Sequence, residues 1–172
     1  MKEVKIGDQV WAQEDLKVTR FRNGEKIPRV SDNEKWSRLD SAAYCLTEMG
    51  NYLYNWYAVN DPRGLAPKGW YVPTDEEWTE LTEYLGGERV AGYKMKSPIW
   101  DGSNTSGFDA LPGGYRCDHG VLGTFRHVGY WWSSLPDNSN AYNLRLSSYY
   151  DDVYLGSHHQ RYGFSVRCIK RN

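Results

Sequence analysis

Residues 141–170, AYNLRLSSYYDDVYLGSHHQRYGFSVRCIK, decide how this chain folds. The last part, Gly163 to Lys170, alternates in character and predicts a strand with one face turned inward. The part from Asn143 to Tyr162 is crowded with Tyr, Ser, Asp, His and Asn, which suit a binding surface better than a core. Four apolar residues within it are placed to anchor two strands while the polar tips point outward: Leu144, Leu146, Val153 and Leu155.

This crowded segment, extended by the strand before it, is the predicted ligand-binding surface. Tyr supplies a large contact area at low entropy cost, while Ser, Asn and Asp make adaptable hydrogen bonds. The competing interpretation is an ordinary exposed hairpin with Tyr side chains half-buried on a sheet face, and the residues leave both interpretations open. The residues predicted to contact a ligand are Trp131, Trp132, Ser134, Asn143, Arg145, Ser147, Tyr149, Tyr150, Asp151, Asp152, Tyr154, Ser157, His158, His159 and Arg161.

A helix is predicted from Thr74 to Leu85, where a Gly-Gly pair ends it. Thr74 is the expected N-cap, and Glu77, three residues on, completes a capping box. Trp78, Leu81 and Leu85 form one apolar stripe. We expect this stripe to pack on a sheet, because a single helix has no other partner.

The remaining segments predict strands and turns. Residues 1–21 predict an opening strand or hairpin that turns at Gly7-Asp8, and Asn23-Gly24 predicts another turn. Residues 52–59 carry alternating bulky side chains and predict a buried strand. Residues 88–129 form a long Gly-rich excursion, and loops of that length are usually functional or packed by their own side chains.

The composition indicates a globular chain with many aromatic side chains. Its 172 residues are enough for a real core, and we interpret residues 1–172 as a single domain. A net charge of −1 predicts no nucleic-acid partner. No apolar run approaches the roughly 18 residues of a membrane helix, and the first residues do not resemble a signal peptide. Eight Trp and fourteen Tyr indicate a polar network in the core, aromatic display on the surface, or both.

The cysteine and histidine positions favour neither a metal site nor a catalytic site. Cys45, Cys117 and Cys168 allow one disulfide at most and contain no CxxC pair. His158 and His159 are adjacent, so on an extended backbone they point to opposite faces. Calcium requires several converging oxygen ligands, and no Gly-x-Ser-x-Gly motif supplies a nucleophile. We therefore predict no metal, no other cofactor and no enzymatic activity.

Short blocks in a fixed order along nearly the whole chain carry a family resemblance. The blocks are 6–11 (IGDQVW), 53–58 (LYNWYA), 67–70 (PKGW), 72–78 (VPTDEEW), 106–108 (SGF), 111–116 (LPGGYR), 131–134 (WWSS) and 163–168 (GFSVRC). Together they resemble the Fibrobacter succinogenes major paralogous domain family. The resemblance implies an α+β, C-type lectin-like fold: a twisted antiparallel sheet with one or two short helices and long loops rich in Gly and aromatic residues.

The same resemblance bears on the cysteines. Cys45 and Cys168 both match family positions, so the resemblance implies that these two form the pair if a disulfide exists. It implies that Cys117, which matches no family position, is a free thiol. Two residues depart from the pattern, since Tyr71 stands where the family usually has His and Ala66 where some members have Cys.

A second resemblance concerns function. C-type lectin-like folds are used by the variable proteins of diversity-generating retroelements in bacteria and phages. There, adenine-directed mutagenesis rewrites codons near the C-terminus and favours Tyr, Asn, Ser, Asp and His, the types found from Asn143 to Tyr162. This resemblance implies a display protein whose C-terminal surface binds a protein or a surface glycan.

Two alternatives remain open. The first is a structural or adhesion module of a bacterial cell-surface protein, in which the same segment is a solvated hairpin. The second rests on Val72 to Trp78, which is similar to a block of formylglycine-generating enzymes. Those enzymes need a close pair of cysteines late in the chain, which this sequence lacks.

Overall fold

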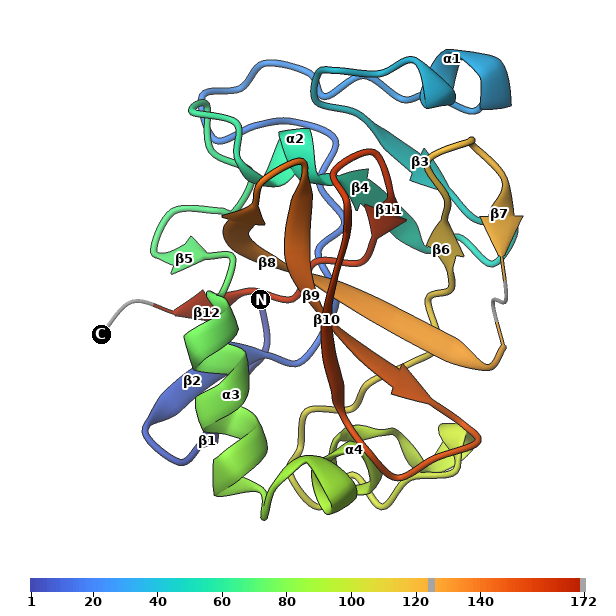
Figure 1. The fold of residues 1–172 in the computed structure, drawn as a ribbon. Helices are drawn as coiled ribbons and strands as arrows, with labels where there is room; N and C mark the ends of the chain where they lie inside the picture. The colour runs from blue at the N-terminus through green and yellow to red at the C-terminus, as the bar shows by residue number, and fades with distance from the viewer. Residues whose placement is uncertain (124–125, 171–172) are drawn as a thin grey trace.

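The computed structural model describes residues 1–123 and 126–170, which form mostly antiparallel strands and a few short helices (Figure 1). The strands are β1 (Glu3–Ile6), β2 (Gln9–Ala12), β3 (Tyr44–Leu46), β4 (Tyr52–Asn55), β5 (Trp70–Tyr71), β6 (Tyr115–Arg116), β7 (Leu122–Gly123), β8 (Val128–Asp137), β9 (Asn140–Ser147), β10 (Tyr154–His159), β11 (Gly163–Phe164) and β12 (Ile169–Lys170). The helices are α1 (Asn33–Ser37), α2 (Trp56–Val59), α3 (Asp75–Tyr84) and α4 (Glu88–Met95), with a 3-10 turn, η1 (Pro98–Trp100). The α+β class is therefore confirmed.

The strands are arranged in three sheets. Their orders are β1-β2-β12-β5, β3-β4-β11-β6-β7 and β10-β9-β8. The last of these, which we call the hairpin sheet, contains the three longest strands and runs across the front of the molecule in Figure 1. The opening hairpin forms as predicted, since Ile6 pairs with Gln9 across the Gly7-Asp8 turn.

The segment from Gly163 to Ile169 is buried along its whole length and connects two sheets. β11 lies between β4 and β6, while β12 lies between β2 and β5. The prediction of one strand with a single inward face is therefore wrong. Phe164 and Val166 belong to one buried cluster and Ile169 to a second, so the segment passes between two cores and presents no face to solvent.

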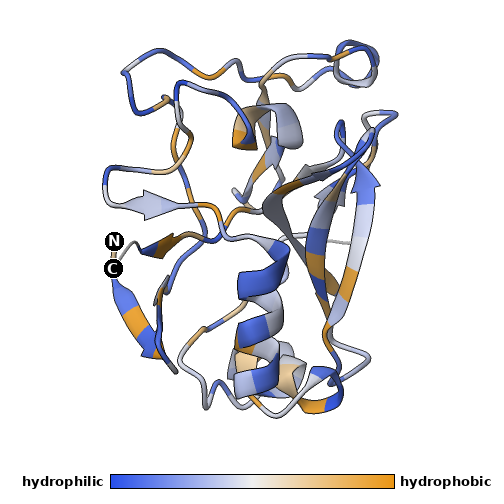
Figure 2. Ribbon diagram, turned by 60° about the vertical axis from the view of Figure 1, so that its left-hand side comes forward, coloured by the Kyte–Doolittle hydropathy of each residue, from blue (hydrophilic) through white to orange (hydrophobic). Residues whose placement is uncertain are grey.

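The helix predicted at Thr74 is α3, and its cap is confirmed. The Thr74 hydroxyl accepts from the Glu77 N–H at 3.2 Å, and the Glu77 carboxylate accepts from the Thr74 N–H at 2.8 Å. The apolar stripe of Trp78, Leu81 and Leu85 is buried against the hairpin sheet and α4. Figure 2 shows α3 beside the long strands of the hairpin sheet, along which hydrophilic and hydrophobic residues alternate.

Residues 52–59 are only half strand, which corrects the prediction of one buried strand. β4 ends at Asn55, whose buried side-chain oxygen accepts from the N–H groups of Ala43 and Ala58. An Asn that satisfies two backbone donors in this way caps a helix, here the short α2. The local alternation of bulky residues carries no information about this cap, because the cap depends on the polar Asn55 side chain.

The excursion at residues 88–129 contains α4, η1, β6 and β7, so it is more structured than predicted. Helix α4 escaped prediction because Gly87 offers no side-chain cap and Gly92 lies mid-helix, where glycine disfavours helix. A Cβ on Gly92 would lie 2.5 Å from the backbone oxygen of Asp152. The glycine thus allows α4 to touch the turn between β9 and β10.

All three cysteines are free thiols, so the disulfide implied between Cys45 and Cys168 is not formed. The two residues are buried in different hydrophobic clusters. Burial raises the pKa of Cys168 to about 12 and also raises the pKa of Cys45, so both remain protonated at neutral pH. Neither thiol has the reactivity of an exposed thiolate.

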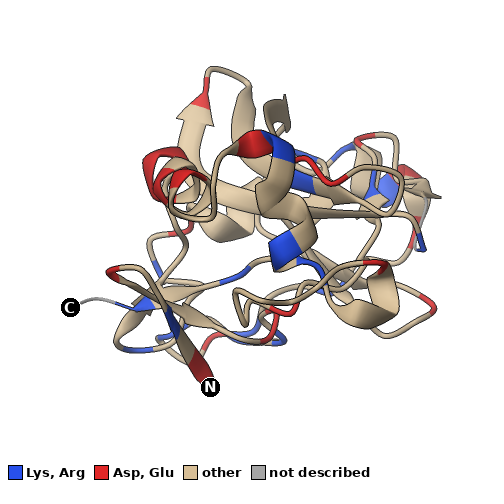
Figure 3. Cartoon of the chain, turned by 90° about the horizontal axis from the view of Figure 1, so that it is seen from below, with Lys and Arg blue, Asp and Glu red and all other residues tan. Residues whose placement is uncertain are grey.

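Charges of both signs are interspersed over the described chain, without one concentrated basic field (Figure 3). No helix among the described residues is long and apolar enough to cross a membrane. No group of three His, Cys, Asp or Glu side chains within residues 1–123 and 126–170 is placed to hold a metal ion.

Candidate ligand-binding surface

The hairpin sheet exposes one of its faces more than the other. Leu144 and Leu146 of β9, with Leu155 of β10, turn toward α3 and belong to the core there. Residues at the alternate positions turn the other way, because successive side chains of a strand point to opposite faces. Six residues form what we call the aromatic face: Tyr115, Tyr130, Arg145, Tyr154, His158 and Tyr162.

Four rings of the aromatic face follow one another in a closed circuit. Tyr130 lies 5.5 Å from Tyr115 and 5.4 Å from His158, with both of these rings nearly perpendicular to its own. Tyr162 completes the circuit at 5.0 Å from His158 and 6.3 Å from Tyr115. Underneath, the buried Phe164 stacks on Tyr130 at 4.6 Å and 13°. The rings are therefore held by one another and by the core.

Arg145 links this circuit to the exposed Tyr154. Its guanidinium lies 4.7 Å from the centre of the Tyr154 ring, a cation–π contact, and its charge also acts on the Tyr130 hydroxyl. Burial raises the pKa of Tyr130, and Arg145 partly opposes that shift. The hydroxyl therefore stays protonated and can donate to a ligand.

His158 is a neutral member of the aromatic face. Burial, and to a smaller extent the charge of Arg145, lower the pKa of His158 below its usual value. The Asn143 amide donates to Nδ1 of His158 at 3.0 Å, which leaves the ring proton on Nε2. The neutral imidazole therefore offers a ligand an aromatic ring and one N–H donor, and it carries no positive charge.

The turn between β9 and β10 is fastened to α4 and the residue after it. The buried Lys96 ammonium donates to the carbonyl oxygens of Ser147 at 2.9 Å and Tyr150 at 2.7 Å. The Tyr93 N–H donates to the Asp151 carbonyl at 3.1 Å. These bonds hold a backbone on which the side chains of Tyr149 and Tyr150 are 66% and 61% exposed.

Four predicted contact residues are buried, which corrects their assignment to the surface. Trp131 and Trp132 are completely buried, and Asn143 and Ser147 are no more than 5% exposed. At Trp131 and Trp132, β8 is covered on both faces, by α3 on one side and by Phe164 on the other. The two Trp indoles donate inward, to Asp15 and to the Tyr54 carbonyl, so they belong to the core.

Three more predicted residues have structural contacts. The Ser134 N–H donates to the Pro73 carbonyl at 2.8 Å, next to the start of α3. Arg161 donates through Nε to the Leu39 carbonyl at 2.7 Å, and its own N–H donates to Nδ1 of His159 at 3.1 Å. The contacts of Arg161 and His159 brace the turn after β10.

The other predicted residues are accessible at three places. Arg145, Tyr154 and His158 lie on the aromatic face, and Tyr149, Tyr150, Asp151 and Asp152 lie in the turn between β9 and β10. Ser157 lies on the side facing α3.

The sequence missed three members of the aromatic face. Tyr130 could have been found from the alternation along β8, because it pairs opposite Arg145. Tyr162 lies three residues after the end of β10, within the crowded segment. Tyr115 comes from β6, 25 positions before the start of β9, and no local pattern marks it.

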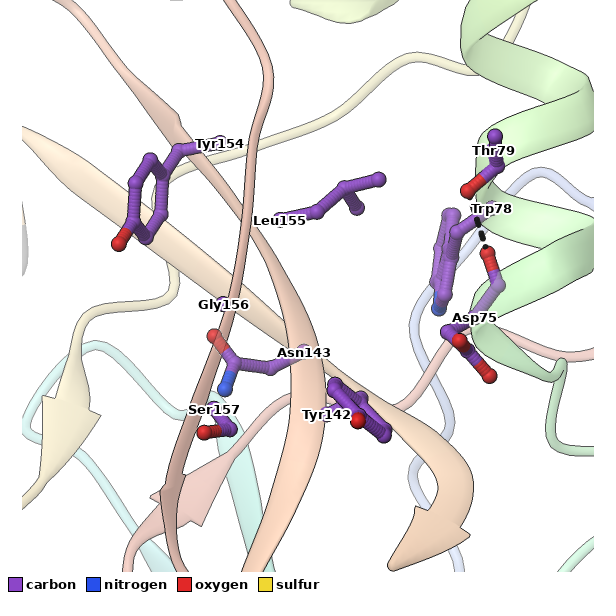
Figure 4. Close-up of a pocket in the computed structure, with 9 residues that line it drawn as sticks. All are labelled: Asp75, Trp78, Thr79, Tyr142, Asn143, Tyr154, Leu155, Gly156 and Ser157. Carbon is purple, nitrogen blue, oxygen red and sulfur yellow. Dashed lines mark hydrogen bonds between the residues drawn. The ribbon is translucent and has the colours of Figure 1, made fainter. Parts of the chain in front are cut away.

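A groove separates α3 from the edge strand β10 and has a volume of about 440 Å³ (Figure 4). In Figure 4, Leu155 and Tyr142 point toward the helix, while Tyr154 points away from it. The groove is lined by Asp75, Trp78 and Thr79 of α3 and by Tyr142, Asn143, Tyr154, Leu155, Gly156 and Ser157 of the hairpin sheet.

The fold and this surface define a class: an α+β protein of antiparallel sheets that carries an exposed aromatic surface on its longest hairpin. The chain belongs to the Fibrobacter succinogenes major domain family, whose model matches residues 4–170. This confirms the family resemblance over nearly the whole chain. Comparison with curated proteins and with solved structures gave no significant match.

Proposed function

We propose that this chain is a non-enzymatic binding protein whose aromatic face and adjoining turn meet a protein or a surface glycan. The observation that carries the proposal is the circuit of partly exposed rings gathered from β6, β8, β10 and the following turn. Tyr and Arg are the residues that most often dominate binding energy at interfaces. An exposed aromatic ring also accommodates the apolar face of a sugar ring, while the hydroxyls and Arg145 bond to its edge.

The rigidity of this surface supports the same proposal. Lys96 and the bonds from α4 fix the turn, and Phe164 supports the rings from below. Side chains that are already held in place lose less conformational entropy when a ligand binds. A hairpin that was only solvated would not need a buried lysine to hold its turn.

The proposal includes a C-type lectin-like scaffold and variation of this surface by a diversity-generating retroelement. The composition from Asn143 to Tyr162 supports that part. The burial pattern of the hairpin supports variation at its exposed positions. Exposed positions such as Tyr149, Tyr150 and Tyr154 have few packing constraints, whereas Leu144 and Val153 are enclosed by the core.

We expect sibling genes from the same genome to differ at the exposed positions of the hairpin and to agree at the buried ones. Substitutions should cluster at Arg145, Tyr149, Tyr150 and Tyr154, in adenine-rich codons. Sequencing the siblings, together with a search of the flanking DNA for a reverse transcriptase, measures this. Substitutions spread evenly over the chain would contradict the retroelement.

Truncating the aromatic face should abolish binding. On an array of bacterial and host surface glycans and surface proteins, the double variant Arg145→Ala/Tyr154→Ala should lose at least about tenfold in signal on every spot that the wild type retains. Tyr84→Ala, which removes an exposed ring at the far end of α3, is the control and should bind like the wild type. Equal binding by the double variant would show that the aromatic face is not the site.

A further inference from the structure

The second feature that could bind a partner is the free edge of β10. β10 is the outer strand of the hairpin sheet. The Gln160 N–H donates to the Ser139 carbonyl, and by the alternation of an antiparallel ladder this turns the backbone groups of Tyr154, Gly156 and His158 toward β9. The N–H and C=O groups of Leu155 and Ser157 therefore point to the open edge. Within the described part of the chain, no hydrogen bond to these groups is found outside the sheet.

This edge lacks the features by which proteins normally prevent strand addition. Exposed edges are usually protected by Lys, Pro, a bulge or an inward-pointing charge. β10 reads YLGSHH, with no Lys, no Pro and no carboxylate, and it pairs with β9 in unbroken register. Gly156 at its centre carries no side chain that would hinder an approaching backbone.

The groove beside α3 gives this edge a side-chain pocket. A strand added to β10 would continue the pleat of the sheet, so every second side chain would point to the side of the sheet that carries the groove, and one of them would enter it. The volume of about 440 Å³ is sufficient for one long side chain. The groove wall is apolar at Trp78 and Leu155 and polar at Asp75, Thr79 and Ser157.

The acidic character of the groove favours a positively charged side chain as its occupant. Oδ1 of Asp75 is buried and has no hydrogen-bond partner among the described residues. No Lys or Arg is among the residues that line the groove. Glu76 adds a second carboxylate in the same helical turn. A cationic side chain with N–H donors complements this arrangement.

We propose that the edge of β10 binds an extended peptide, which adds a fourth strand to the hairpin sheet and places a Lys or Arg side chain in the groove against Asp75. The main-chain bonds to Leu155 and Ser157 supply affinity, and the groove supplies specificity, as in other cases of strand addition. This site shares Tyr154 with the aromatic face but does not rest on the proposed function, because its contacts come from the backbone of β10 and from residues of α3.

The probe is a set of labelled nine-residue peptides of alternating threonine and valine with lysine, norleucine or glutamate at the centre. In fluorescence anisotropy with the full chain, the lysine peptide should bind about tenfold tighter than the norleucine peptide, and the glutamate peptide should bind weakest. Two further versions of the lysine peptide carry N-methyl groups on alternate backbone nitrogens, one version on the odd-numbered residues and the other on the even-numbered residues. Only the version whose methylated nitrogens face β10 should lose binding. Equal affinity for the three peptides, no binding of the lysine peptide, or equal effects of both methylated versions would overturn the proposal.

Two variants test the protein side of the same contact. Asp75→Asn should remove the preference for lysine over norleucine, while Glu83→Gln, on the same helix but away from the groove, should keep it. Ser157→Pro removes one outward N–H and should weaken all three peptides. The melting temperature of Ser157→Pro shows whether this variant folds. If it does not fold, the result for Asp75→Asn tests the proposal on its own. Self-association of the wild type that Ser157→Pro abolishes would identify a second copy as the occupant and overturn the proposal.

Discussion

Replacing Trp78 with alanine is expected to lower the free energy of unfolding by about 3–5 kcal/mol. Trp78 is completely buried, with the Trp11 ring at 4.6 Å and the Phe108 ring at 6.0 Å. Its indole N–H is directed at the Trp132 carbonyl at 3.4 Å. The substitution leaves a cavity at the junction of α3, β2 and the hairpin sheet, and none of these elements can close it without leaving its other contacts.

Urea unfolding followed by circular dichroism measures this loss. Tyr84→Ala is the matched control, because it removes a 65% exposed ring from the same helix and should cost less than about 1 kcal/mol. A loss below about 1 kcal/mol for Trp78→Ala would mean that α3 is not held on the sheet by this residue. The groove beside β10 would then have no fixed wall.

Replacing Arg167 with methionine is the second substitution with a large expected effect, about 3–5 kcal/mol. The buried guanidinium donates to Asp15 at 2.7 Å, to the Ala12 carbonyl at 3.1 Å and to the Phe108 carbonyl at 2.6 Å. Methionine fills a similar volume and donates to none of them. The Asp15 carboxylate and the two carbonyl oxygens would lose these bonds inside the protein, which is the costly situation for a polar group.

The same unfolding experiment tests Arg167→Met, with Arg89→Met as its control. Arg89 is exposed on α4, so its replacement should change stability by no more than about 0.5 kcal/mol. An effect of Arg167→Met as small as that of the control would show that the three acceptors find other donors. The stability of the two buried clusters would then not depend on Arg167, which lies in the segment between them.

The helix α3 and the hairpins could be predicted because their determinants are local. Thr74 and Glu77 stand three residues apart and cap the helix by themselves, and the Gly7-Asp8 turn closes its hairpin without help from the rest of the chain. Helix α4 could not be predicted in this way. Its Gly92 is explained only by the carbonyl of Asp152, sixty positions away.

The candidate site also has some features that depend on local sequence and others that depend on distant contacts. The position of the hairpin and its supply of Tyr, Arg and His could be predicted, because composition and alternation are properties of a single segment. Which of its side chains reach solvent could not. Trp131 and Trp132 look suitable for display in the sequence, yet both are covered, because β8 lies between α3 and Phe164.

The sequence alone determined the family, the α+β class, the capped helix and the polar, aromatic character of residues 141–162. Only the tertiary structure decided that Gly163 to Ile169 is buried on all sides, that Tyr115 joins Tyr130 and Tyr162 on one surface, and that β10 is an edge beside a groove. The physical reason is the range of the interactions. Caps, turns and alternation act within a few residues, whereas burial and strand order depend on which distant segments pack together.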